Sequence, residues 1–199
     1  MTNKQIKFDA NFTAGGILYN EFIAISSMLE SENFNELITT ETENNNFIGI
    51  AVEASRKRII AEIKRRYAKA PKKFWNHFKN WNEPEKRLGL YYLCLITYPL
   101  VFDVHHEVVI KGFKLGSNLS DYDVQMRFDE LSSSNEDFSN WADITLYKLN
   151  TQIRKALKDA GLYDGTKLFR PQHINPGFVE YFKEINETWF LDAAFINSY

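Results

Sequence analysis

LGLYYLCLITYPLVF, residues 88–102, is the longest uncharged run of the sequence and lies between Arg87 and Asp103. Apolar side chains occupy nearly every position of this run, a pattern typical of a helix that is buried on all sides. The run is shorter than the roughly 18 residues that suggest a membrane span, and Pro99 interrupts it. It therefore predicts two consecutive core helices, one ending at Tyr98 and the next starting at Pro99.

The residues around this run carry the start and stop signals of further helices. Asn82 and Pro84 open the first core helix. Ser120, with Asp123 three residues later, resembles a capping box, and Gly161 is a typical residue just beyond a helix end. We therefore expect a polar loop at 40–46 and helices at 17–29, 35–39, from Ser55 (or already from about Ile50), from Pro71, 82–98, 99–113, 120–132, 139–160 with Ser139 as its cap, and 176–185.

Residues 162–169 contain the one strong strand signal. The turn dipeptide Asp164-Gly165 separates two short apolar segments, which predicts a two-residue β-hairpin. Its apolar side chains would cover the core, or its basic side chains Lys167 and Arg170 would contact a phosphate backbone. The predicted fold class is therefore mainly α, a compact multi-helix domain with one short β-hairpin.

The composition is typical of a globular protein, with 199 residues, 44% of them hydrophobic, and only 9 glycines and 5 prolines. We expect one domain over 1–199, with a possible subdivision into 1–80 and 81–199. The N-terminal stretch MTNKQIKFDANF lacks the apolar segment of a signal peptide, so we expect a cytoplasmic protein that contacts no membrane. Cys94 is the single cysteine, which excludes an internal disulfide and suggests an inert buried residue.

The charged residues are segregated along the chain. Ten of the 24 basic residues but only one of the 26 acidic residues, Glu62, lie between Arg56 and Asn80. This window has a net charge of +9, and the rest of the chain has a net charge of −11. Such a concentrated basic region attracts a polyanion while the remaining surface repels it.

The centre of the basic window predicts an amphipathic helix. We assign Ile59, Ile60, Ile63 and Tyr67 to its apolar face and the basic residues, Arg66 among them, to the opposite face. Like charges at helical spacing repel one another, so a face with so few acids favours nucleic-acid binding over a solvated surface. The candidate DNA-binding residues are Ser55, Arg56, Lys57, Arg58, Lys64, Arg65, Arg66, Lys69, Lys72, Lys73, Lys167 and Arg170.

The sequence contains no motif that favours catalysis. His105 and His106 are adjacent, and neighbours on a helix point about 100° apart, so they do not converge on one metal ion. There is no glycine-rich phosphate loop, nucleophile elbow or spaced pair of metal ligands. We therefore expect a non-enzymatic protein with no catalytic residue, metal, cofactor or small-molecule substrate.

Four short motifs, in this order and spacing, resemble the BrxA family of BREX bacteriophage-exclusion systems. They are FTAGGIL at 12–18 followed by Glu21, ASRKRII at 54–60, LYYLC at 90–94 and LKDAGL at 157–162. The resemblance implies a compact helical, non-enzymatic protein that binds double-stranded DNA and works beside other BREX components. It further implies a winged-helix-like portion and a shape similar to the NusB antitermination factor. By position, it assigns DNA contact to Ser55–Arg58 and the basic helix behind them.

Two alternatives keep the same charge pattern but change the partner. Structured RNA would satisfy the basic face as DNA does, and a NusB-like shape would permit it. Alternatively, the basic face would dock an acidic protein of the defence complex, so that the chain acts as a protein-protein adaptor. The expected mode on DNA is a grip on the duplex backbone with little base specificity.

Overall fold

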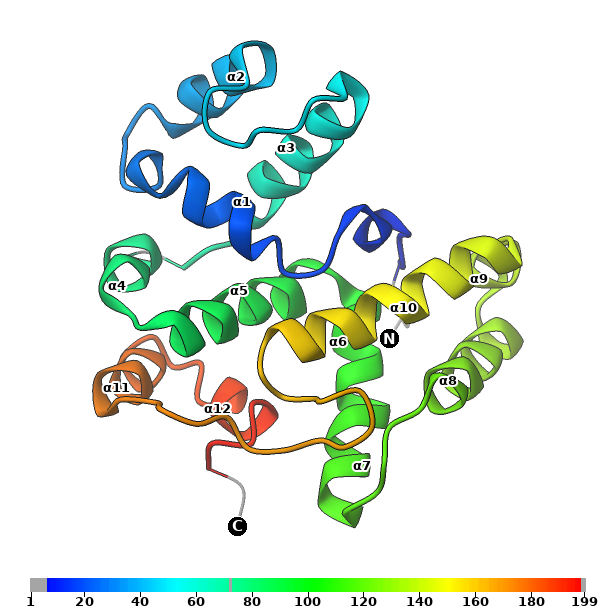
Figure 1. Ribbon diagram of the computed structural model, residues 1–199. Coiled ribbons are helices and arrows are strands. Elements are labelled where there is room, and N and C mark those ends of the chain that lie inside the picture. Colours follow the sequence, from blue (N-terminus) through cyan, green and yellow to red (C-terminus); the bar gives the residue numbers. More distant parts are fainter. Residues whose placement is uncertain (1–6, 72, 198–199) are drawn as a thin grey trace, which may run out of the picture.

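The computed structural model describes residues 7–71 and 73–197 (Figure 1). The described chain is mainly helical, with connecting segments and no β-strand. Its elements are η1 (Asn11–Ala14), α1 (Tyr19–Ala24), η2 (Ser26–Met28), α2 (Phe34–Asn44), α3 (Glu53–Tyr67), α4 (Phe74–Asn80), α5 (Glu83–Thr97), α6 (Pro99–Val104), η3 (His105–Val109), α7 (Ile110–Leu115), α8 (Asp121–Ser134), α9 (Glu136–Ser139), α10 (Asp143–Asp159), α11 (Pro176–Glu184) and α12 (Trp189–Ala193).

Helix α5 lies at the centre of the core, as its uncharged sequence predicts. A capping box starts it: Asn82 Oδ1 accepts a hydrogen bond from the Glu85 backbone N–H at 3.0 Å, and Glu85 Oε2 accepts one from the Asn82 N–H at 2.9 Å. From Leu88 to Leu95 every residue of the helix is buried. Burial on all sides stabilises this helix mainly through removal of apolar surface from water.

The second core helix begins at Pro99, as predicted, and continues through α6, η3 and α7 to Leu115. Its five-residue η3 segment is a π-helical bulge within the otherwise α-helical rod. Within the described ranges no single helix is long and apolar enough to cross a bilayer. Taken together, α5 and the helix from Pro99 to Leu115 have the length and composition of a span, but they are bent by 109° at their junction.

The predicted loop at 40–46 is wrong, because α2 continues to Asn44. Thr40 and Thr42 donate their hydroxyls to carbonyl oxygens four residues earlier, so these polar residues are accommodated within the helix. The buried Glu41 carboxylate then accepts three backbone hydrogen bonds, from the N–H groups of residues 46, 47 and 48, at 2.8–3.0 Å. A single acidic side chain therefore organises the connection from α2 to α3.

Three other predicted helix boundaries are also wrong. Residues 17–29 form α1 and η2 instead of one helix, and Leu18, just before α1, has a left-handed φ of 56°. Helix α3 begins at Glu53, between the two predicted starts near Ile50 and at Ser55, so Ser55 lies within the helix and is not its cap. The helix predicted at 139–160 starts only at Asp143, and Ser139 is not its cap but the last residue of the short α9, which Asn135 caps through the Phe138 N–H.

The predicted β-hairpin at 162–169 is wrong, because no strand forms in the described residues. The segment makes a tight turn with single bridges from Tyr163 to Leu168 and from Asn118 to Lys167. Two backbone hydrogen bonds close the turn, from the Asp164 N–H to the Lys167 carbonyl and from the Phe169 N–H to the Leu162 carbonyl, both at 3.1 Å, and the Tyr163 hydroxyl lies within hydrogen-bond distance of the carbonyl oxygens of Leu119 and Gly165. We call residues 162–169 the turn segment.

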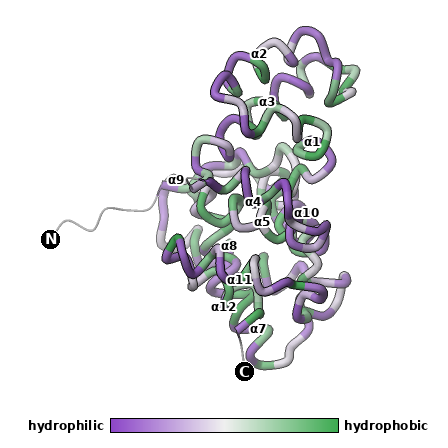
Figure 2. The backbone as a smooth tube through the Cα atoms, turned by 90° about the vertical axis from the view of Figure 1, so that its left-hand side faces the viewer, coloured by the Kyte–Doolittle hydropathy of each residue, from purple (hydrophilic) through white to green (hydrophobic). Residues whose placement is uncertain are grey.

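The buried apolar residues form one cluster that extends from Phe12 to Phe195. Aromatic rings occupy much of it, and the last described residues dock onto it through Phe190, Leu191 and Phe195. Figure 2 shows hydrophobic residues along the interior of the molecule, with α2 and α3 at one end and α7 towards the other. The basic helix therefore lies at one end of the molecule.

Candidate nucleic-acid interface

The face of α3 that points away from the core carries most of its basic side chains. Buried Ile60 and Ile63 hold the other face of α3 in the core, and α3 packs against α2, α5 and η1. Ser55, near the start of α3, is also exposed. The basic side chains that are at least partly exposed on α3 and just after it are Lys57, Arg58, Lys64, Arg65 and Lys69, which we call the α3 face.

The predicted assignment of Arg66 to the exposed basic face is wrong, because this residue is 0% exposed. Its Nε donates to the Tyr98 hydroxyl at 3.0 Å and its Nη2 donates to the Gly15 carbonyl at 3.1 Å. Tyr98 donates its own hydroxyl to the buried Glu62 carboxylate. Burial raises the pKa of Tyr98, which keeps that hydroxyl protonated. Arg66 is therefore part of an internal polar network.

Arg56 is also buried, with 7% of its surface exposed. Its Nε donates to the Thr42 carbonyl at 2.7 Å and its Nη1 donates to the Ile50 carbonyl at 2.6 Å. These bonds satisfy one carbonyl in the last turn of α2 and one in the connection between α2 and α3. The sequence predicts that Arg56 contacts DNA, but in the structure its guanidinium group lies inside the protein.

Carboxylates partly neutralise other members of the basic window. Lys57 lies 2.5 Å from Glu53 within the same helix. Arg65 lies 3.2 Å from Asp9 and 3.8 Å from Glu62, and it remains 38% exposed. Exposed ion pairs of this kind are weak, typically about 0–1 kcal/mol, so a polyanion competes readily for these cations. The Lys79 side chain is paired as well, with Glu30 at 2.9 Å.

Three cations of the α3 face have no carboxylate within salt-bridge distance among the described residues. Arg58 donates instead to the Thr13 hydroxyl at 2.6 Å, Lys64 donates to the Thr39 hydroxyl at 2.7 Å, and Lys69 is exposed. Lys73 is exposed just before α4. The predicted Lys72 lies outside the described residues. The α3 face therefore keeps a positive charge that the fold does not compensate.

Lys167 and Arg170, which are predicted to contact a phosphate backbone, are exposed, but the structure does not bring them to α3. In Figure 1, α10 lies between α3 and the turn segment. The Asp164 carboxylate accepts hydrogen bonds from the Lys167 and Thr166 N–H groups, both at 2.7 Å, and these bonds lower its pKa. An ionised carboxylate therefore sits at the tip of the turn, which weakens any phosphate contact there.

Helix α10 carries a second basic surface that the sequence predictions did not include. Lys148, Lys155 and Lys158 are exposed on it, and no described carboxylate lies within salt-bridge distance of them. The sequence signal was present, since no acidic residue occurs between Asp143 and Asp159. This signal is less obvious in the sequence, because α10 carries fewer basic residues than the window at 56–80.

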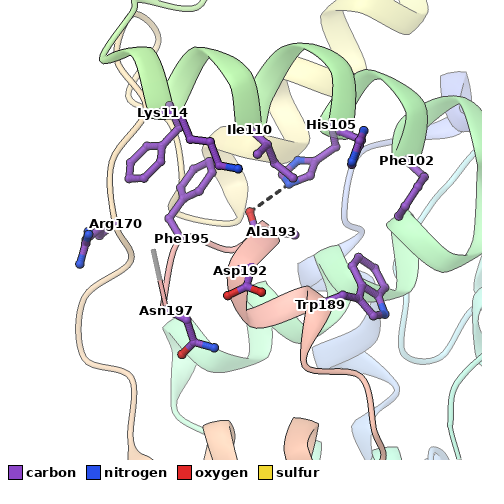
Figure 3. A pocket seen from close by; sticks show the side chains of 12 residues that line it. Phe102, His105, Ile110, Lys114, Arg170, Trp189, Asp192, Ala193, Phe195 and Asn197 are labelled. Atoms are coloured by element: carbon purple, nitrogen blue, oxygen red, sulfur yellow. Dashed lines mark hydrogen bonds between the residues drawn. The ribbon is translucent and has the colours of Figure 1, made fainter. Parts of the chain in front are cut away.

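His105 is a structural residue at a cavity of about 810 Å³ between the helix from Pro99 to Leu115 and α12 (Figure 3). Its Nε2 donates to the Ala193 carbonyl at 3.0 Å and its Nδ1 accepts from the Tyr91 hydroxyl at 2.7 Å. Burial lowers the pKa of His105 to about 4, so the ring is neutral near pH 7. Lys114 and Asp192 also line this cavity, and in Figure 3 they extend from opposite walls.

Among the described residues no group of three or more His, Cys, Asp or Glu side chains is arranged to hold a metal ion.

The fold and these surfaces define a mainly helical protein with two basic helix faces, on α3 and α10. The chain belongs to the BrxA family, whose model matches residues 6–186. It is similar to the crystal structure of an uncharacterized protein from Magnetospirillum magneticum, with a TM-score of 0.76 and 17% sequence identity over 95% of this chain and 98% of that chain. At this identity the likeness concerns the fold alone. A search of curated proteins finds no match.

Proposed function

We propose that this chain is a non-enzymatic, double-stranded DNA-binding protein of a BREX phage-defence system that acts in the cytoplasm. Membership of the BrxA family supports the link to BREX. The observation that carries the DNA-binding proposal is the α3 face, where Arg58, Lys64 and Lys69 have no carboxylate partner among the described residues. In this proposal other BREX components are partners, and no membrane, cofactor or small-molecule substrate is needed.

The charge distribution suits a grip on the phosphate backbone. Lysine and arginine side chains that neutralise phosphates release condensed counterions, and this release supplies most of the sequence-independent affinity. The acidic remainder of the chain repels the duplex, so that only the basic end of the molecule approaches it. Ser55, exposed near the start of α3, adds a hydroxyl that can donate to a phosphate oxygen.

The arrangement around α10 supports a winged-helix-like portion as a finer part of the proposal. Helices α8 and α10 pack on each other, and the turn segment follows α10 directly. Asn118, just before α8, forms a bridge with Lys167 after the turn. Helix, helix and turn in this order, closed by a contact back to the segment before the first helix, is the layout of winged-helix DNA-binding modules. The single bridges stand where such modules have short strands.

A salt titration of DNA affinity tests the proposal. If the five cations of the α3 face each contact a phosphate, the slope of log K against log salt is about −4.5, from roughly 0.9 per phosphate. We expect Arg58→Ala/Lys69→Ala to flatten this slope by up to about 1.8 and to weaken binding to all sequences alike. A matched control is Lys114→Ala/Lys183→Ala, which removes the same charge from exposed positions on α7 and α11 and should leave the slope unchanged.

The alternatives give different results in the same assay. Stronger binding to a structured RNA of equal length than to duplex DNA would replace the proposed ligand. If the protein binds no nucleic acid at physiological salt but retains an acidic BREX partner in a pull-down of the purified components, it acts as a protein-protein adaptor. Equal flattening by the α7/α11 control would show that the effect is one of net charge and would contradict a site on α3.

A further inference from the structure

The exposed side of α10 forms one continuous stripe along the helix. Its positions are spaced by three, four or seven residues, so they line a single face. The opposite side is held rigidly, since Leu149, Ile153, Ala156 and Leu157 are buried in the core. The residues of the exposed stripe, which we call the α10 face, are Ile144, Tyr147, Lys148, Thr151, Lys155 and Lys158.

The α10 face exposes large apolar side chains that the fold does not cover. Ile144 is 58% exposed and Tyr147 is 66% exposed. These two side chains lie at one end of the stripe, beside Lys148 and Thr151. Single exposed apolar residues are common, but an aromatic ring and a branched aliphatic chain next to lysines on one helix face are typical of a contact surface.

The charge of the α10 face selects a polyanionic partner. Lys148, Lys155 and Lys158 have no described carboxylate within salt-bridge distance, and the stripe itself contains no acid. Asp159 is half-buried and lies towards Gly16, where its Oδ2 would be 3.5 Å from a Cβ added to that glycine. It therefore sits at the margin of the stripe and does not neutralise it.

The segment from η1 to Gly16 connects the α10 face with the α3 face. It packs against both helices. Thr13 accepts a hydrogen bond from Arg58 of the α3 face, and the Gly16 N–H donates to the side chain of Gln152 of α10 at 3.0 Å. A ligand that lies along α3 therefore meets α10 on the other side of this segment.

We propose that α10 enters the major groove of duplex DNA and reads base edges there, in addition to the backbone contacts of α3. This inference rests on the proposed function, because it requires that the chain bind duplex DNA. The major groove is about 12 Å wide and admits one helix. Lys148 and Lys155 are two helical turns apart, roughly 10 Å along the axis, so they reach phosphates while Tyr147 and Thr151 face the base edges. Tyr147 offers a hydroxyl and an apolar ring, and Thr151, whose hydroxyl donates to the Tyr147 carbonyl at 3.0 Å, offers an acceptor oxygen and a methyl group for thymine.

The test compares two duplexes of identical sequence, one of which carries glucosylated hydroxymethylcytosine. The sugar fills the major groove and leaves the phosphate backbone in place. We expect the wild-type protein to bind the glucosylated duplex about tenfold or more weakly, as expected for loss of a good base contact. We expect Tyr147→Ala/Thr151→Ala to lose this discrimination without a change in salt slope, and Lys148→Ala/Lys155→Ala to flatten the slope by up to about 1.8.

The control is again Lys114→Ala/Lys183→Ala, which should behave as wild type on both duplexes. All substituted side chains are exposed, and thermal unfolding by circular dichroism verifies that each variant folds. Equal wild-type affinity for the two duplexes overturns the inference, and if Arg58→Ala/Lys69→Ala still flattens the slope, the proposed function stands without it. No binding to either duplex contradicts the proposed function itself. A change of oligomeric mass in the α10 variants, without a change in DNA affinity, would assign the α10 face to contact between copies of the chain.

Discussion

Arg65 and Arg66 are neighbours in the sequence, but their guanidinium groups meet opposite surroundings. Arg65 is partly exposed beside Asp9, and Arg66 is fully buried between Tyr98 and the Gly15 carbonyl. Helical spacing explains the difference, because Arg66 follows Ile59 by seven residues, two turns, and therefore shares its face. Burial of a charged side chain requires compensating partners, and two nitrogens of Arg66 have them, while its Nη1 has no hydrogen-bond partner among the described residues. The net positive charge of residues 56–80 is therefore larger than the charge that their exposed side chains carry.

His105 provides a prediction at the scale of one residue. Its pKa is lowered from 6.5 to about 4 by burial, so the unfolded chain binds a proton at higher pH than the folded chain. Stability from the neutral ring is fully present above pH 6.5 and is lost as pH falls towards 4. By this linkage we expect wild type to lose about 1 kcal/mol of unfolding free energy between roughly pH 7.5 and pH 5.5 through this group.

Urea unfolding of wild type and His105→Gln across that pH range measures the effect. The variant is less stable at neutral pH, because it loses the ring packing, but its stability should depend less on pH. His106→Gln is the matched control, since His106 is 59% exposed on the adjacent position. An equally steep pH dependence in His105→Gln would show that other groups cause the loss of stability in acid.

At the scale of elements, two helical glycines predict opposite effects of the same substitution. A Cβ on Gly89 of α5 would lie 2.5 Å from Trp81 Cζ3, and Trp81 is itself packed against Phe178. A Cβ on Gly112 of α7 would meet only Leu168, at 3.6 Å. We expect Gly89→Ala to destabilise by about 1–3 kcal/mol through overpacking, and Gly112→Ala to stabilise by about 0.5–1 kcal/mol through helix propensity. Chemical denaturation checks both values, and stabilisation by Gly89→Ala would contradict the packing of Trp81 on α5.

The elements that the sequence predicts correctly are those with strong local signals. The helix start predicted at Asn82, the capping box predicted at Ser120 and the stop predicted at Gly161, which has a φ of 74°, all form. The errors occur where tertiary contacts override local preference. Residues predicted as a polar loop continue helix α2, where the buried Glu41 carboxylate accepts backbone hydrogen bonds from the residues that follow the helix. A hairpin is predicted where a tight turn forms, and the Tyr163 hydroxyl contacts the carbonyl of Gly165 within this turn.

The candidate interface is predictable only in part for the same reason. The sequence locates the basic helix, but whether a basic side chain faces solvent depends on partners such as Tyr98, 32 residues after Arg66. The α10 face carries a weaker signal, because its three lysines are spread over three helical turns. Its significance depends on which side of α10 is buried and on which carboxylates come near, and both follow from packing with α8, α5 and η1.

At the scale of the whole molecule, the net charge of −2 conceals a basic end and an acidic remainder. The fold reduces the asymmetry by burying two arginines and pairing others, but three cations of the α3 face and the three lysines of the α10 face have no carboxylate within salt-bridge distance among the described residues. An acidic remainder opposes association along any other side of the molecule. The fold thereby favours one orientation on a polyanion, with α3 and α10 towards it.

Asp9 gives a prediction about this charge balance. Its carboxylate lies 3.2 Å from Arg65 and accepts a hydrogen bond from it, so in the proposed complex DNA would compete with Asp9 for that cation. We expect Asp9→Asn to remove this pair, which leaves Glu62 at 3.8 Å as the remaining carboxylate near Arg65, and to strengthen DNA binding at low salt, because binding no longer has to break the pair with Asp9. Glu180→Gln on α11 is the charge-matched control, because this exposed acid makes no ion pair among the described residues. The same gain in Asp9→Asn and Glu180→Gln would indicate a general effect of net charge, whereas a gain confined to Asp9→Asn would place Arg65 at the DNA, since only that substitution frees a cation on the α3 face.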